Sequence, residues 1–207
     1  MVLGFPPSAP GLALGWRALP SRLLATVCAL CVMAGLAQAG ELKSDERPPA
    51  DRRPAYAIKA GYLYKLTPFV DWPATAFESA ASPFRLCIAG EDPLGGAVDH
   101  AARGVRVGDH PVVVVRLPTL AKGAPCHLLF LAASRTQTAQ QMLGLVAGQP
   151  VLTVADEGLD APGAVVQFVT VDSRVRFEIR ADAAQAAGLT VSSKLLALTT
   201  QAKEGGR

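Results

Sequence analysis

The most reactive side chains after Gly40 are cysteines and histidines beside two apolar runs. Cys87 lies inside the run Phe84–Ala89, whereas Cys126 and His127 stand at the start of a later run. In an exported chain two such cysteines most simply form one disulfide, and two reduced, buried thiols are the alternative. A metal site is a weak interpretation, because His100, His110 and these residues lack CxxC or HxxxH spacing. A catalytic thiol is weaker still, since no helix start or basic cluster is evident to lower a thiol pKa.

Two other segments have residue types that could bind or attack a substrate. Gly90–Gly96 follows a predicted strand and opens a predicted helix, where backbone amides could receive an anion. The segment lacks the phosphate-loop lysine and the dinucleotide glycine spacing, which favours an ordinary turn. Ser192, Ser193 and Lys194 resemble a serine–lysine hydrolase motif only superficially, because a serine that begins a helix is usually its cap. We therefore expect no catalytic residue, no cofactor and no bound metal.

Aromatic residues gather in one short part of the chain. They are Tyr56, Tyr62, Tyr64, Phe69 and Trp72. With helical spacing only some of them can face one core, so exposed members would mark a binding surface. An ordinary helix packed on a sheet is the alternative.

The segment at 1–39 has the pattern of a secretory signal peptide. Arg17 and Arg22 precede an uncharged stretch of about fourteen residues, and Ala37-Gln38-Ala39 follows it. The stretch is too short to span a bilayer comfortably, which favours cleavage after Ala39 over direct membrane insertion. We therefore expect an exported protein.

Cleavage would change the composition of the chain. It would remove Cys28 and Cys31 together with Arg17 and Arg22, so that two of the 20 basic side chains are lost while all 17 acidic ones stay. The nearly neutral product argues against a nucleic-acid-binding surface and against electrostatic attachment to membranes. With 50% hydrophobic and 18% charged residues, the whole chain is also unlike a disordered protein. We predict a flexible leader at 40–54, one domain at 55–200 and a disordered tail at 201–207.

The domain is predicted to be α/β, a single layered domain with a mixed, mostly parallel sheet, an antiparallel edge hairpin and flanking helices. A helix should begin at Ala55 and end or kink at Pro68, with Lys59 and Lys65 off its apolar stripe. Short apolar runs bounded by Gly, Pro and Asp indicate buried strands. These runs are Phe84–Ala89, Pro111–Leu117, His127–Ala132 and Val151–Ala155.

Helices and a hairpin complete the predicted domain. Ser134 with Gln137, and Asp182 with Gln185, have the spacing of helix capping boxes. Alternating residues in Arg174–Arg180 indicate a half-exposed strand that pairs with Ala164–Val171. Further helices are predicted at Leu94–Ala102, before Gly148 and from Ser192.

The order of these segments resembles the YfiR family of exported proteins, from about Ala55 to Leu198. The matching segments are Ala57–Lys65 with Phe69–Pro73, Leu86–Gly95, Cys126–Phe130, Leu152–Asp156, and Val175–Ile179 with Ala187–Leu196. The resemblance implies a small periplasmic protein, often a homodimer, that binds the periplasmic sensory domain of an inner-membrane diguanylate cyclase and holds it inactive. Release of the cyclase would raise cyclic di-GMP and promote biofilm formation.

The resemblance also implies roles for particular residues. Cys87 and Cys126 match a family disulfide, and family members sense envelope redox or reductive stress through such bonds. This chain lacks a second cysteine pair that some relatives carry, so redox sensing and simple stabilisation both stay open. Apolar residues near the carboxyl end form the family's repressive surface, which points to Phe177, Ile179, Leu195 and Leu196, although all four could be core residues.

From the residues alone, a second function stays open. It is a periplasmic small-molecule-binding protein, with its pocket at the carboxyl ends of the parallel strands and at Gly90–Gly96.

Overall fold

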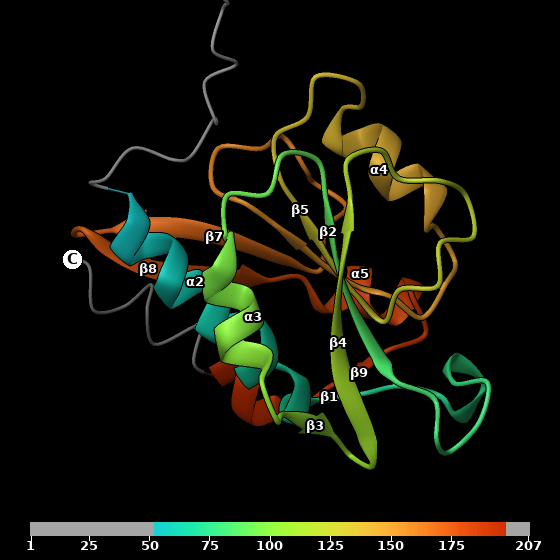
Figure 1. The fold of residues 1–207 in the computed structure, drawn as a ribbon. Coiled ribbons are helices and arrows are strands. Elements are labelled where there is room, and N and C mark those ends of the chain that lie inside the picture. Colours follow the sequence, from blue (N-terminus) through green and yellow to red (C-terminus); the bar gives the residue numbers. More distant parts are fainter. Residues whose placement is uncertain (1–51, 198–207) are drawn as a thin grey trace, which may run out of the picture. The chain divides into compact units, whose positions relative to one another are not determined.

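The computed structural model describes residues 52–197, which form a layered α/β fold (Figure 1). The predicted signal peptide, most of the predicted leader and the tail at 201–207 lie outside the described residues. Helix α2 (Arg53–Lys65) begins two residues before the predicted start, with Pro54 in its first turn. Proline is favoured there because its fixed φ suits the helix and its missing N–H is not needed. In residues 52–197 we find no helix long and apolar enough to cross a membrane.

A seven-stranded sheet forms the centre of the fold, in the order β3-β4-β2-β5-β6-β7-β8. The inner strands from β4 to β7 are parallel, and β3 and β8 are antiparallel to their neighbours. This arrangement confirms the predicted mostly parallel sheet with an antiparallel hairpin at one edge. The strands are β2 (Phe84–Ala89), β3 (Arg106–Val107), β4 (His110–Leu117), β5 (Leu128–Leu131), β6 (Leu152–Ala155), β7 (Val166–Val171) and β8 (Arg174–Ile179).

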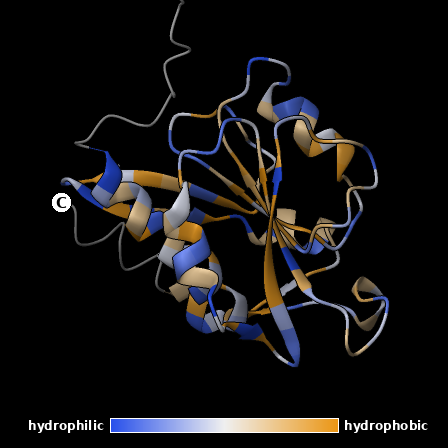
Figure 2. Cartoon of the chain, in the orientation of Figure 1, coloured by the Kyte–Doolittle hydropathy of each residue, from blue (hydrophilic) through white to orange (hydrophobic). Residues whose placement is uncertain are grey.

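Helices pack on both faces of this sheet and create two cores. Helices α2, α3 (Gly96–Ala102) and α5 (Ala181–Ala186) contribute to one core with Leu86 and Ile88 of β2. Helix α4 (Ala139–Leu145) packs on the opposite face, where β2 presents Cys87. Because β2, β5 and β6 are covered on both faces, their sequences are nearly continuous apolar runs, and they take the hydrophobic colours in Figure 2.

The two predicted capping boxes are wrong in position. Helix α4 is capped by Thr138, whose hydroxyl accepts from the Gln141 amide at 3.2 Å while the Gln141 side chain accepts from the Thr138 amide at 2.8 Å. Ser134 does accept from the Gln137 amide, but the Gln137 side chain exchanges two hydrogen bonds with the backbone of Leu120. Ser134 therefore begins a turn and not a helix, and the Gln137 side chain connects this turn to the loop that contains Leu120.

The second correction concerns α5. Its N-cap is Arg180, which makes no side-chain capping bond, and Asp182 lies inside the first turn. A carboxylate there still interacts favourably with the positive end of the helix dipole.

Two 3-10 helices and a small two-stranded sheet lie near the two ends of the domain. Pro68 lies in the 3-10 helix η1 (Thr67–Phe69), directly after the end of α2. The strands β1 (Val70–Asp71) and β9 (Thr190–Val191) pair with each other in a separate antiparallel sheet. A second 3-10 helix, η2 (Ala74–Ala76), precedes β2, and residues 193–197 are helical.

Candidate functional site

A groove of about 240 Å³ lies between α2, η1, strand β8 and the helical residues 193–197. Its lining is mostly apolar and aromatic, with two cationic residues. The lining residues are Tyr62, Lys65, Leu66, Phe69, Val175, Arg176, Phe177 and Leu195. This volume is below the range of about 300–1,000 Å³ that holds whole small molecules, so it suits one or two side chains of a partner.

Two of the four residues carried over from the family resemblance lie together in this groove. Phe177 is half-buried, and its ring meets the Tyr62 ring edge-on with the centroids 5.5 Å apart. Leu195 is only 2% exposed, so it forms the floor of the groove. Ile179 and Leu196 are half-buried and are not among the lining residues, although Ile179 packs against the same core as Phe177.

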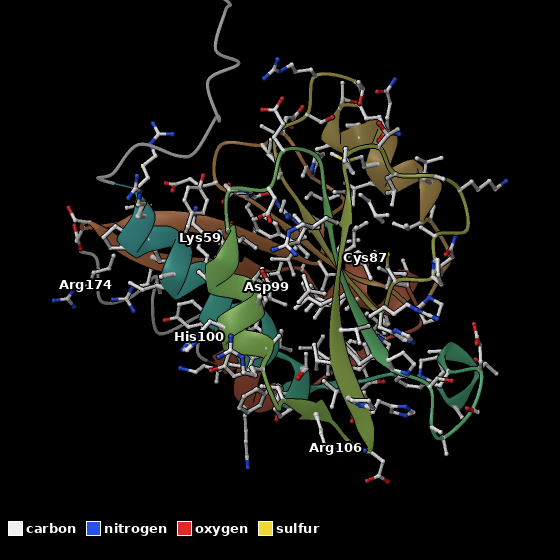
Figure 3. The ribbon with its side chains drawn as sticks, viewed as in Figure 1. Lys59, Cys87, Asp99, His100, Arg106 and Arg174 are labelled. Carbon is white, nitrogen blue, oxygen red and sulfur yellow. A yellow bond between two sulfur atoms is a disulfide. The ribbon has the colours of Figure 1, made fainter. Side chains whose placement is uncertain are left out.

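Helix α2 is held to the carboxyl end of β6 by a buried ion pair that sequence reasoning missed. Lys59 Nζ lies 2.7 Å from Asp156 Oδ1, and the two residues are 3% and 6% exposed. Tyr56 donates from its hydroxyl to the other Asp156 oxygen at 3.1 Å. Figure 3 shows Lys59 on α2. The prediction that Lys59 lies off the buried stripe is therefore wrong, because the carboxylate at the strand end compensates its charge.

The polar groups around this ion pair all have partners. The pKa of Tyr56 is raised to about 12, chiefly by burial and also by the negative charge of Asp156. Glu157 lies 3.6 Å from Lys59 Nζ and accepts from the Thr170 hydroxyl. A signal was present in the sequence, since an acidic residue directly follows a buried parallel strand, where α/β proteins place their functional groups. Here that carboxylate fastens a helix.

The cysteines form a disulfide between β2 and the residue two positions before β5. The Cα atoms of Cys87 and Cys126 lie 5.8 Å apart, and the residues are 1% and 6% exposed. Both belong to the core beneath α4, on the face of the sheet opposite α2. The disulfide lies at β2 and beside β5, in the middle of the sheet. Strands β6 and β7 stand between β5 and β8, the strand that lines the groove.

His127 holds the segment before β2 against the amino ends of the strands. Its Nδ1 accepts from the Arg85 amide at 3.0 Å, so its Nε2 carries the proton and donates to the Ala76 carbonyl at 3.0 Å. Phe77 stacks between His127 and His110 with centroid separations of 4.6 and 3.8 Å. Burial lowers the pKa of His127 and favours this neutral form.

Both ring nitrogens of His127 are thus engaged, and the neighbouring Cys126 sulfur is in a disulfide. Among the described residues no group of three or more His, Cys, Asp or Glu side chains could hold a metal ion. The His100 side chain is on α3 and is exposed.

The Gly90–Gly96 turn receives a carboxylate of its own. Asp92 Oδ1 accepts from the amides of Leu94 and Gly95 at 2.8 and 3.1 Å, and its other oxygen binds Arg116 at 2.8 Å. Arg116 also pairs with Asp99 at 2.6 Å, and this bond lowers the pKa of that carboxyl. The Leu94 and Gly95 amides, which a bound anion would need, therefore already donate to Asp92. This supports the interpretation of the segment as an ordinary turn.

Gly90 is required for packing, because a Cβ atom there would lie 2.5 Å from the Ala133 carbonyl oxygen. The serines near the carboxyl end also have a structural place. Ser192 Oγ accepts from the Leu195 amide at 3.4 Å, as a helix cap does, and Ser193 and Lys194 are exposed.

Comparison with known proteins gives one family. The family described as YfiR/HmsC-like has a model that matches residues 56–200, which is more than two thirds of the chain. The match includes every strand of the sheet and the residues that line the groove. No curated protein matches the chain.

Proposed function

The chain belongs to the YfiR/HmsC-like family, and from this membership we propose that it is a periplasmic regulator that binds the sensory domain of an inner-membrane diguanylate cyclase. It acts by contact, without catalysis, and holds the cyclase inactive. Release of the cyclase under envelope stress raises cyclic di-GMP and promotes biofilm formation. The exported form begins after Ala39 and is a homodimer.

The groove between α2 and β8 is the observation that carries this proposal. It is open, mostly apolar and of a size for one or two protruding side chains, which is the usual anchor of a protein interface. Phe177 and Leu195 line it, and Ile179 and Leu196 stand beside it on β8 and the last helix. Elsewhere, Lys59, His127 and Asp92 are engaged in bonds within the fold.

Capture of the cyclase from membranes tests the proposal. The mature chain, immobilised through a tag, should retain a diguanylate cyclase from detergent-solubilised inner membranes, and deletion of its gene should raise cyclic di-GMP. Lys65→Glu at the rim of the groove should weaken capture, whereas Lys122→Glu, an exposed residue outside the groove, should not. Failure to retain any cyclase, together with unchanged cyclic di-GMP, would refute the proposal.

Two further measurements address the form of the protein. The intact mass of the exported protein should correspond to the segment 40–207 with one disulfide. Light scattering on a size-exclusion column should give the mass of a dimer.

A further inference from the structure

Strand β8 stands at the end of the seven-stranded sheet, with β7 on one side. Its pairing with β7 is continuous over six residues, from Arg174 opposite Val171 to Ile179 opposite Val166, without a bulge. In residues 52–197 no strand pairs with its outer edge. Natural proteins usually block such edges with proline, bulges or charged side chains. Strand β8 has no proline or bulge, and its charged residues, Arg174, Arg176 and Glu178, all lie on one face.

The backbone groups that face this outer edge can be identified. The Arg180 amide donates to the Val165 carbonyl at 2.8 Å, which extends the β7–β8 ladder by one pair. In an antiparallel ladder every second residue bonds to the same neighbour, so Arg174, Arg176 and Glu178 also direct their amides and carbonyls toward β7. Val175, Phe177 and Ile179 therefore direct theirs toward the open edge.

The two faces of β8 differ in chemistry at this edge. Val175 and Phe177 line the apolar groove beside α2, and Arg176 also contributes to its lining. Arg174 and Arg176 are exposed and alternate with them along the strand, and neither makes an ion pair or side-chain hydrogen bond with another described residue. Figure 3 shows Arg174 pointing away from the sheet at the end of the hairpin.

We propose that the open edge of β8 binds a partner strand in which apolar residues alternate with acidic ones. The partner's backbone pairs with Val175, Phe177 and Ile179, its apolar side chains enter the groove, and its carboxylates meet Arg174 and Arg176. Strand addition to a sheet edge gives affinity through the main chain and specificity through alternate side chains. This inference rests on the proposed function, because it identifies how the cyclase domain is held.

The charges of β8 favour an acidic strand over a second copy of the chain as the occupant. The charged face of β8 and the residue after it carries three arginines and one glutamate. In an antiparallel pair of two copies centred on Phe177, Arg174 would face Arg180 at both ends, while Arg176 would face Glu178, so two repulsive pairs offset two attractive ones. An acidic strand has no such repulsion.

Amide hydrogen exchange with a defined peptide tests this binding mode. The probe is a short peptide of alternating valine and glutamate, blocked at both ends, and the control peptide has lysine in place of glutamate. We expect the glutamate peptide to slow exchange at Val175, Phe177 and Ile179 by about tenfold or more, and the lysine peptide to have no effect. Unchanged exchange with the glutamate peptide at millimolar concentration would overturn the proposal. So would protection of these amides on concentrating the chain alone, because the occupant would then be a second copy.

Two variants separate backbone pairing from side-chain contact. Val175→Pro removes the amide N–H that faces the open edge and breaks no hydrogen bond to β7. Val175→Ala also shortens the side chain but keeps that amide. We expect Pro to abolish peptide binding and Ala to weaken it less than about fivefold. The double variant with Arg174→Glu and Arg176→Glu should bind the lysine peptide in preference to the glutamate peptide. This variant changes no backbone group of β8, so it tests the proposal even if Val175→Pro fails to fold.

Capture of the cyclase then distinguishes the two proposals. If wild type and Val175→Pro retain the cyclase equally, strand addition is wrong and the regulatory function stands. If the peptide protects β8 but wild type retains no cyclase, the regulatory function is wrong.

Discussion

A single lysine fixes the first turns of α2 to the sheet, although lysine is usually a surface residue. Lys59 is buried between the rings of Tyr56 and Phe168, with its nitrogen 4.8 and 5.8 Å from their centroids. Removal of one partner of a buried ion pair leaves an uncompensated charge away from water. We therefore expect Lys59→Met to lower the free energy of unfolding in urea by about 3–5 kcal/mol.

Lys65 provides the matched control for this prediction. It lies on the same helix and is exposed, so Lys65→Met should change the free energy of unfolding by less than about 0.5 kcal/mol. Asp156→Asn should destabilise as Lys59→Met does, and the double variant should lose less than the sum of the two. Additive losses would show that there is no interaction energy between the Lys59 and Asp156 side chains.

His127 should make the stability depend on pH. Burial lowers its pKa in the folded protein, whereas the unfolded chain titrates near the ordinary value of 6.5. Below that pH the unfolded state binds the proton more readily, so the contribution of His127 is complete above pH 6.5 and declines as the pH falls below it. Urea unfolding between about pH 5 and pH 8 measures this decline. His127→Phe should keep the stack and flatten the profile, while His100→Ala, on α3, should leave it unchanged.

The β7–β8 hairpin presents the open edge, and the turn between its two strands is strained. Asp172 and Ser173 have φ values of 49° and 58°, in the left-handed region. A two-residue turn of this type favours Asn-Gly or Asp-Gly, because glycine adopts positive φ without steric cost. We expect Ser173→Gly to raise the free energy of unfolding by about 1 kcal/mol. Ser173→Ala keeps a Cβ atom at the same φ and should give no gain, as thermal unfolding can show.

The central strands were predictable from sequence because a strand that is buried on both faces is a short, continuous run of apolar residues. The run Phe84–Ala89 matches β2 residue for residue, and the alternation in Arg174–Arg180 located β8 and its partner. Capping boxes were less informative, since Ser134 with Gln137 and Thr138 with Gln141 satisfy the same three-residue spacing. Only tertiary contact to Leu120 decides between them.

Residues that act across the sequence were the least predictable. Lys59 and Asp156 are 97 positions apart, and helical periodicity alone places a lysine on the solvent side. The groove has the same origin, since Tyr62, Phe177 and Leu195 come from three separate segments. The family resemblance indicated Phe177 and Leu195, and the fold places both in the lining of one groove.

At the scale of the whole molecule, the sheet separates the disulfide from the proposed binding surface. Cys87 and Cys126 lie in the core beneath α4, whereas Phe177 packs against the core beneath α2. The strand order adds a second separation, because β5, β6 and β7 lie between β2 and β8. Loss of the disulfide should therefore act on the stability of the whole domain more than on the shape of the groove.

The variant with both Cys87→Ser and Cys126→Ser tests this expectation. A bond between cysteines 39 positions apart stabilises by roughly 4 kcal/mol in the chain-entropy model, so urea unfolding should show a loss of that order. Under conditions where the variant remains folded, its affinity for the cyclase domain should stay within about twofold of wild type, because sites without shared contacts act independently. A larger loss of affinity in the folded variant, repeated when wild type is reduced, would instead make the disulfide a redox switch for the β8 surface.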